Sequence, residues 1–197
     1  MPRPVTNNLI TSEAMPAIRV QVHPSLTYVG TLESTLRQTS FAEIAIFVDA
    51  DEQGRISRKL TVYFEHFLES ALDKRFRYNT PETVTLNGVV YQTDLRCVPS
   101  HLYLEDDDTE SDWQQINRYL AGQGYAPPYH QEQVLTKRLI RLLGDDQRAE
   151  FLLVYNEAHA GPPHTHPDDM YLVLKSDDRQ HLAGFEQRAL ASFQLLG

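Results

Sequence analysis

The chain has 197 residues, of which 41% are hydrophobic and 23% are charged, a balance typical of a folded globular domain. Its 18 Lys and Arg residues against 27 Asp and Glu residues give a formal net charge of −9. An acidic chain repels nucleic-acid phosphates and anionic lipid surfaces, so nucleic-acid and membrane-surface roles are disfavoured. The single cysteine, Cys97, cannot form an internal disulfide, and the N-terminal residues lack the apolar core of a secretory signal. We therefore expect a cytoplasmic protein.

The first regular structure that the sequence predicts is a set of antiparallel strands. Residues 1–18 form a flexible N-terminal arm in this prediction, ahead of a single domain over residues 19–197. Two β-rich runs between residues 44 and 66 flank a short polar turn, and they predict a long β-hairpin with one buried face. Asn87 with the glycine after it lies between two alternating runs, which is a strong signal for a second hairpin with a two-residue turn.

The alternation of the first hairpin places Arg58 and His66 on its apolar side. A charged group there costs free energy unless it is paired or reaches a polar cavity. Two interpretations stay open: both side chains lie at strand ends and make structural hydrogen bonds, or both line a ligand pocket. We carry Arg58 and His66 forward as candidate pocket residues.

Helical patterns follow the second hairpin. Ser111 and Gln114 have the spacing of a capping box ahead of a helix that ends at a glycine. Residues 133–143 fit either a helix or a strand, and we favour the helix because their leucines have helical spacing. The tail from Ser176 onward predicts an amphipathic C-terminal helix that covers a sheet.

Together these elements predict an α+β fold, with an antiparallel, curved β-sheet built from hairpins and packed by two or three helices, including the C-terminal one. For such a domain we expect a ligand-binding or adaptor role without chemistry, with a pocket between the sheet and a covering helix. Cys97 and His101 are the residue types of a thiol nucleophile and its base, but Pro99 lies between them and the spacing fixes no contact geometry.

The stretch HAGPPHTHPDD near the C-terminus concentrates residues that bind metals. In an extended segment His164 and His166 project to the same side, which allows two imidazoles to bind one Zn²⁺, Fe²⁺, Ni²⁺ or Mn²⁺ ion. His159 is a third candidate ligand, and Asp168 and Asp169 are weaker candidates. These residues predict the alternative function, a metal-dependent hydrolytic or oxidative enzyme in which the ion activates a bound water. Two other interpretations stay open: a proline-stiffened loop whose histidines are polar surface, and a metal-free role of the histidines as a general base or pH sensor.

Two metal-binding families have similar motifs. GPPHTHPDD followed by MYLVL resembles the first metal motif of the cupins, in which an HxH pair and a following Glu bind the ion inside a β-barrel. HTHP is also similar to the zinc motif of the JAMM isopeptidases, with Asp177 at the place of that family's later Asp ligand. Either resemblance implies a metal on His164 and His166. Met170 or Tyr171 stands at the cupin Glu position, and the sequence has neither the second cupin motif nor a placed upstream JAMM Glu, so we assign neither family.

Elemental analysis of the purified protein tests the metal interpretation. For a metal site the expected result is about one equivalent of transition metal in the parent protein, and its loss in both His164→Ala and His166→Ala. The interpretation is contradicted if the protein contains no metal and its thermal stability does not change when Zn²⁺, Ni²⁺ or Mn²⁺ is added. A ligand that binds the folded state must stabilise it.

Overall fold

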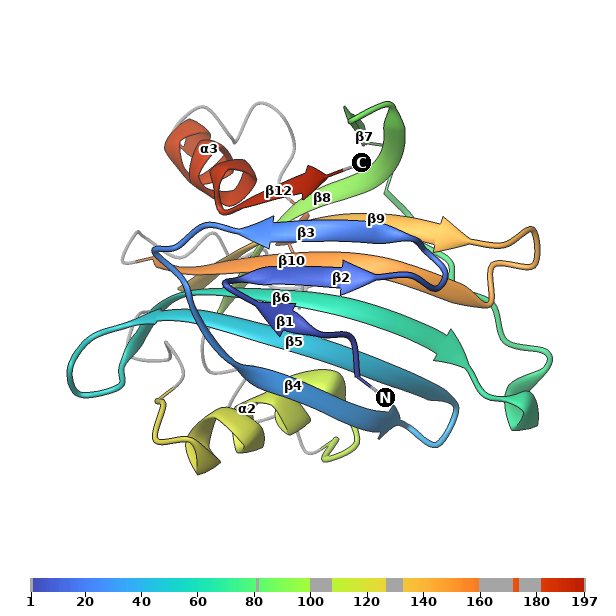
Figure 1. The fold of residues 1–197 in the computed structure, drawn as a ribbon, viewed down its shortest axis with the longest axis horizontal. Helices are drawn as coiled ribbons and strands as arrows, with labels where there is room; N and C mark the ends of the chain where they lie inside the picture. The colour runs from blue at the N-terminus through green and yellow to red at the C-terminus, as the bar shows by residue number, and fades with distance from the viewer. Residues whose placement is uncertain are drawn as a thin grey trace.

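The structure is a computed structural model that describes residues 2–80, 82–99, 108–126, 133–159, 172–173 and 182–196. Its strands pair antiparallel in two sheets, and two α-helices accompany them in the described residues (Figure 1). The smaller sheet has the strand order β1-β2-β3-β12, and the larger has the order β11-β8-β9-β10-β6-β5-β4, with β7 paired to β8. The elements are β1 (Val5–Thr6), β2 (Leu9–Ser12), β3 (Ile18–Val22), β4 (Thr27–Leu36), β5 (Ser40–Ala50), β6 (Ile56–Phe67), a 3₁₀ turn (Glu69–Ala71), β7 (Thr83–Leu86), β8 (Val89–Pro99), α2 (Asp112–Gly122), β9 (Gln133–Leu143), β10 (Ala149–His159), β11 (Leu172–Val173), α3 (Ala183–Ala191) and β12 (Phe193–Leu196).

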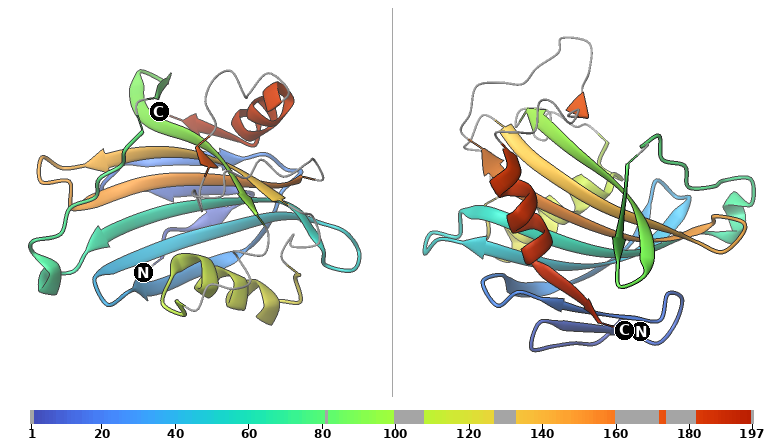
Figure 2. Two further views of the ribbon diagram at one scale, coloured as in Figure 1. Left: turned by 180° about the vertical axis from the view of Figure 1, so that it is seen from behind. Right: turned by 90° about the horizontal axis from the view of Figure 1, so that it is seen from above.

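The two sheets lie face to face around an apolar core, and the right-hand view of Figure 2 shows them as separate layers. Ile10 and Val20 of the smaller sheet share one buried cluster with Leu60 and Phe151 of the larger sheet. Phe185 of α3 belongs to the same cluster. Burial of these side chains removes apolar surface from water, which is the main driving force that joins the sheets.

The other face of the larger sheet carries a second buried cluster. Ile44 and Tyr63 lie there together with Ile116 and Leu120 of α2. Ser111 caps this helix by accepting a hydrogen bond from the backbone N–H three residues on, as the capping-box spacing predicts. The prediction of a hairpin with a single buried face is therefore wrong, because β5 and β6 are covered on both faces.

Both predicted hairpins are present. β5 and β6 pair along their length, and β7 pairs with β8 with Leu86 opposite Val89. Asn87 and Gly88 have φ angles of 50° and 78°, the positive values that a two-residue type I′ turn requires. The prediction of an antiparallel α+β fold built from hairpins is confirmed at this level.

The flexible arm predicted over residues 1–18 needs correction, because β1 and β2 lie within it. Ile10 of β2 is only 1% exposed. Arg3 binds Glu43 of β5 at 2.8 Å, and its guanidinium lies 3.8 Å from the centroid of the Phe64 ring. Strands this short show too little alternation to be recognised from the sequence. Pairing of β2 with β3 is what holds them in the sheet.

Two segments predicted as helix contain strands. Residues 133–143 form β9 between β8 and β10, with both of its faces covered. Apolar residues then occur at both parities, as with Leu139 and Ile140, and such a run cannot be told from a helix by periodicity. The C-terminal helix α3 covers only Ala183–Ala191, and the following Phe193–Leu196 form β12, paired with β3. Pairing with the smaller sheet overrides the helical pattern there.

Ile10→Ala tests whether β2 is part of the core. We predict a loss of about 2–5 kcal/mol in the free energy of unfolding, because the substitution leaves a cavity between the sheets. Glu13→Ala, at an exposed position nearby, is the control and should change stability by about 0.5 kcal/mol or less. Urea unfolding measures both. An Ile10→Ala protein as stable as the parent would show that β2 does not pack as described.

Candidate functional site

The face of the larger sheet that contacts α2 carries polar side chains, and most of them are buried. Side chains alternate across a strand, so every second residue of the central strands points to this face. Lys59, Thr61, Asp94, Glu150 and Asn156 are each at most 2% exposed. Buried polar and charged groups cost free energy unless partners satisfy them, so this face is where a functional site is expected.

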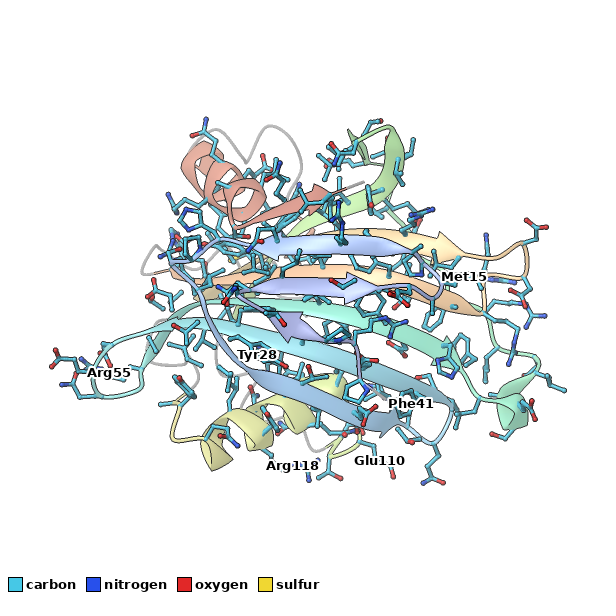
Figure 3. The ribbon with its side chains drawn as sticks, viewed as in Figure 1. Met15, Tyr28, Phe41, Arg55, Glu110 and Arg118 are labelled. Atoms are coloured by element: carbon cyan, nitrogen blue, oxygen red, sulfur yellow. The ribbon has the colours of Figure 1, made fainter. Side chains whose placement is uncertain are left out.

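A cleft of about 390 Å³ opens at one end of this face, between the start of α2 and the sheet. Figure 3 shows Glu110, one of its lining residues, and Phe41 at the same end of the long strands, away from Arg55 at the tip of the β5–β6 hairpin. The cleft has the size of a small-molecule pocket, roughly 300–1,000 Å³. The cleft is lined by Leu36, Arg37, Thr39, Ser40, Glu65, Phe67, Phe76, Tyr78, Glu110, Ser111, Asp112, Arg138, Glu150 and Leu152.

Two carboxyl groups lie side by side on the sheet side of the cleft. Glu65 of β6 and Glu150 of β10 are direct partners in the register of the two strands. Ser40 Oγ donates a hydrogen bond of 2.5 Å to Glu65 Oε1, and Tyr78 OH donates one of 2.9 Å to Glu150 Oε1. Glu150 is 2% exposed, yet its Oε2 has no hydrogen-bond partner among the described residues.

Burial shifts both carboxyl groups toward their protonated forms. Desolvation raises the pKa of Glu150 to about 8, and the charge of Glu65 adds to the increase while the Tyr78 hydrogen bond opposes it. Desolvation also raises the pKa of Glu65 to about 7, against the effect of the Ser40 hydrogen bond. Near neutral pH this pair of carboxyl groups therefore holds a proton.

Arg138 is a cation in the lining whose charge is already matched. Its Nε donates a hydrogen bond of 2.9 Å to Asp94 Oδ1, and its Nη2 donates another to Asp94 Oδ2. Burial alone would raise the pKa of Asp94, but the hydrogen bonds and charge of Arg138, with the charge of Arg96, lower that pKa below its ordinary value. The Arg138 guanidinium also lies 5.2 Å from the centroid of the Tyr78 ring. The ion pair with Asp94 fixes the position of the Arg138 guanidinium beside the cleft.

Lys59 marks a second polar position, farther along β6. Its Nζ lies 3.8 Å from the centroid of the Trp113 ring of α2, which is a cation–π geometry. Burial lowers the pKa of Lys59 to about 7, although the negative charge of Asp112 acts to raise it. Asp112 also accepts a hydrogen bond of 3.0 Å from Tyr63 OH. The first turn of α2 therefore interacts both with Lys59 and with the cleft.

Arg58 and His66 lie toward opposite ends of β6, and neither lines this cleft. The Nε and Nη2 of Arg58 donate hydrogen bonds of 2.9 and 2.5 Å to Asp49 Oδ2. His66 is exposed, and its ring lies 5.6 Å from the ring of Phe41. The pocket role of Arg58 and His66 stays a prediction.

Of the predicted metal ligands, the structure describes only His159, which is half-buried at the end of β10. His164, His166, Asp168 and Asp169 lie outside the described residues. Within the described ranges, no three or more histidine, cysteine, aspartate or glutamate side chains are grouped so as to hold a metal ion. The metal site at the histidine cluster also stays a prediction.

Sequence patterns did not reveal the residues that build the cleft. Lys59 and Glu65 alternate with apolar residues of β6, a pattern typical of a solvent-facing side. Arg138 belongs to the run that we expected to be helical. One signal was available: the continuous apolar run at residues 151–155 is typical of a strand buried on both faces, which indicates that polar residues on its neighbours are buried too.

Comparisons with known proteins add no independent indication of function. No protein-family model, no curated protein and no solved structure matches the chain. In the described parts of the chain, neither helix has the length and apolar composition needed to cross a membrane. The geometry of the cleft is therefore what indicates a role for the protein.

Glu150→Gln tests whether Glu150 carries a proton in the folded protein. Its pKa is raised from 4.5 to about 8 on folding, so the native state binds this proton more tightly than the unfolded chain does. That contribution to stability is lost as the pH rises through about 8. We expect the variant, which mimics the protonated form, to unfold like the parent at about pH 5 and to be more stable at about pH 9.

The expected gain is on the order of 1 kcal/mol for each unit by which folding raises the pKa. Urea unfolding at the two pH values measures the gain. Glu33→Gln, at an exposed position on β4, is the control and should show no pH-dependent gain. An equal difference from the parent at both pH values would contradict the protonated state of Glu150.

Proposed function

We propose that this protein binds a small polar molecule in the cleft and catalyses no reaction on it. The observation that carries the proposal is the buried Glu150 Oε2, which has no partner in the described residues and belongs to a side chain that lines the cleft. Such an atom costs free energy while it is unpaired, and a ligand that forms a hydrogen bond with it removes that cost. The proposal keeps the binding role predicted from the sequence and moves the pocket from Arg58 and His66 to Glu65 and Glu150.

The lining suits a molecule with both polar and apolar parts. The rings of Phe67 and Phe76 stack with centroids 4.2 Å apart and an interplanar angle of 25°. Leu36 and Leu152 add aliphatic surface to the lining. Polar groups converge on the same space from β5, β6, β9, β10 and α2. A few polar groups set in apolar walls are the usual composition of a small-molecule site.

We also propose that this cleft is the pocket between a curved sheet and a covering helix that the sequence predicts. Ser111 and Asp112, at the start of α2, form one of its sides. Ile116 and Leu120 of the same helix share a buried cluster with Ile44 of the sheet. A wall that is capped and packed before the ligand arrives lowers the entropy lost on binding.

The cysteine of the chain supports binding without chemistry. Cys97 is 1% exposed in the cluster between the two sheets, and its Sγ donates a hydrogen bond of 2.8 Å to Gln133 Oε1. Burial raises the pKa of Cys97 to about 11, so the side chain is a thiol rather than a nucleophilic thiolate at neutral pH. A metal-dependent enzyme using His164 and His166 stays the alternative, and the cytoplasmic location stays a prediction.

A panel of small probes tests the binding role: n-butylamine, agmatine, glutarate and glucose, each followed by saturation-transfer NMR. We expect at least one of them to bind the parent protein, because the cleft is polar and open to solvent. Thr39→Trp places an indole in the lining and should abolish that binding.

Thr27→Trp is the matched control, since Thr27 is exposed at the far end of β4 and does not line the cleft. This variant should bind the same probe with unchanged affinity. The proposal is wrong if no probe binds the parent, or if a folded Thr39→Trp protein, judged by an unchanged unfolding midpoint, binds as the parent does.

A further inference from the structure

Carboxyl side chains outnumber cationic ones in the lining, with Glu65, Glu110, Asp112 and Glu150 against Arg37 and Arg138. Glu65, Asp112 and Glu150 all belong to the lining. Arg138 lies beside them, but both of its charged hydrogen bonds described above go to Asp94. An anionic ligand would disfavour the ionised forms of these carboxyl groups, because like charges repel strongly in surroundings of low dielectric, whereas a cation favours those forms. The charge that the cleft accepts is therefore positive.

Glu150 indicates which kind of cation fits. Its Oε1 accepts a hydrogen bond from Tyr78 OH, whereas its buried Oε2 has no partner in the described residues. An ammonium or guanidinium N–H next to Glu65 and Glu150 donates to this oxygen once the carboxylate turns toward the ligand, and it places its positive charge beside two carboxylates. A quaternary ammonium group has no N–H and would leave the oxygen unpaired.

We propose that the cleft binds a small organic cation with N–H donors, a primary amine or a guanidine, between Glu65 and Glu150. This inference rests on the proposed binding function and adds the chemical class of the ligand. Phe67, Phe76 and Tyr78 provide aromatic surface in the lining, against which the alkyl chain and the cation of the ligand pack. The cation belongs either to a free molecule or to a lysine or arginine side chain of another protein, and the test below separates the two.

Binding exchanges protons for the cation. In the empty cleft, burial raises the pKa of Glu65 to about 7 and that of Glu150 to about 8. A cation between them stabilises the carboxylates and lowers both pKa values, so protons leave as the ligand enters. Affinity therefore falls as the pH falls from about 8 to about 6, because protons compete for the same oxygens. The other charged or titratable groups that face the pair are Tyr63 of β6, Tyr78, Arg138 of β9 with Asp94 of β8, Asp112 of α2, and Arg37 and Glu110 at the mouth.

Isothermal titration calorimetry with n-butylamine, agmatine and Nα-acetyl-lysine methylamide tests this class of ligand. At about pH 8 we expect agmatine or n-butylamine to bind with release of protons, detected as a dependence of the heat on the ionisation enthalpy of the buffer. Binding of the lysine derivative alone assigns the cation to a protein side chain. Glu150→Gln should weaken binding about tenfold or more, because a hydrogen bond to a charged group is lost.

Two matched controls sharpen the experiment. Glu33→Gln removes an exposed carboxylate outside the lining and should leave binding unchanged. Tetramethylammonium carries the charge without an N–H and should bind about tenfold more weakly than agmatine.

Three results would overturn the inference but not the proposed function. The first is binding of glutarate or glucose, blocked by Thr39→Trp, without binding of any amine or guanidine; the proposed function then survives. The second is cation binding that Glu150→Gln does not weaken. The third is tetramethylammonium binding as tightly as agmatine. If no probe binds at all, the inference and the proposed function fail together.

Discussion

The central strands β6, β9 and β10 are buried on both faces, and the two faces are buried by different means. On one face the smaller sheet and α3 bring apolar side chains against Leu60 and Phe151. On the other face the same strands present Lys59, Glu65 and Glu150 beside the apolar cluster that includes Ile116 and Leu120 of α2. Removing charged groups from water without a full set of partners costs free energy. The proposed ligand follows from these buried charged groups, because their partners within the protein are incomplete.

The free-energy cost of burying each charged group on this face is lowered in a different way. Arg138 and Asp94 neutralise each other through two charged hydrogen bonds. Lys59 lies against the ring of Trp113, and burial lowers its pKa to about 7, so that it titrates close to neutral pH. The two cleft glutamates instead retain a proton, because burial penalises their charged forms. They are the groups on this face for which we propose an external cation as the partner.

Local patterns predicted the features that depend on adjacent residues. The turn at Asn87 and the cap at Ser111 are confirmed because backbone dihedral angles and capping involve only a few neighbouring positions. The strand over residues 133–143 was missed because pairing on both sides, rather than local propensity, decides its structure. Glu65 and Glu150 become neighbours only through the register of β6 with β10. No local pattern encodes that register, so the residues that build the cleft could not be predicted from the sequence.

The most direct test is a ¹³C NMR titration of the side-chain carboxyl groups of Glu65 and Glu150, with and without agmatine. If the cleft is a proton-linked cation site, the two groups titrate near pH 7 and pH 8 in the free protein, well above the ordinary value of 4.5. Agmatine then moves both titrations to lower pH. Titration of both groups near pH 4.5 in the free protein, unchanged by agmatine, would contradict the burial of this pair and its role in binding.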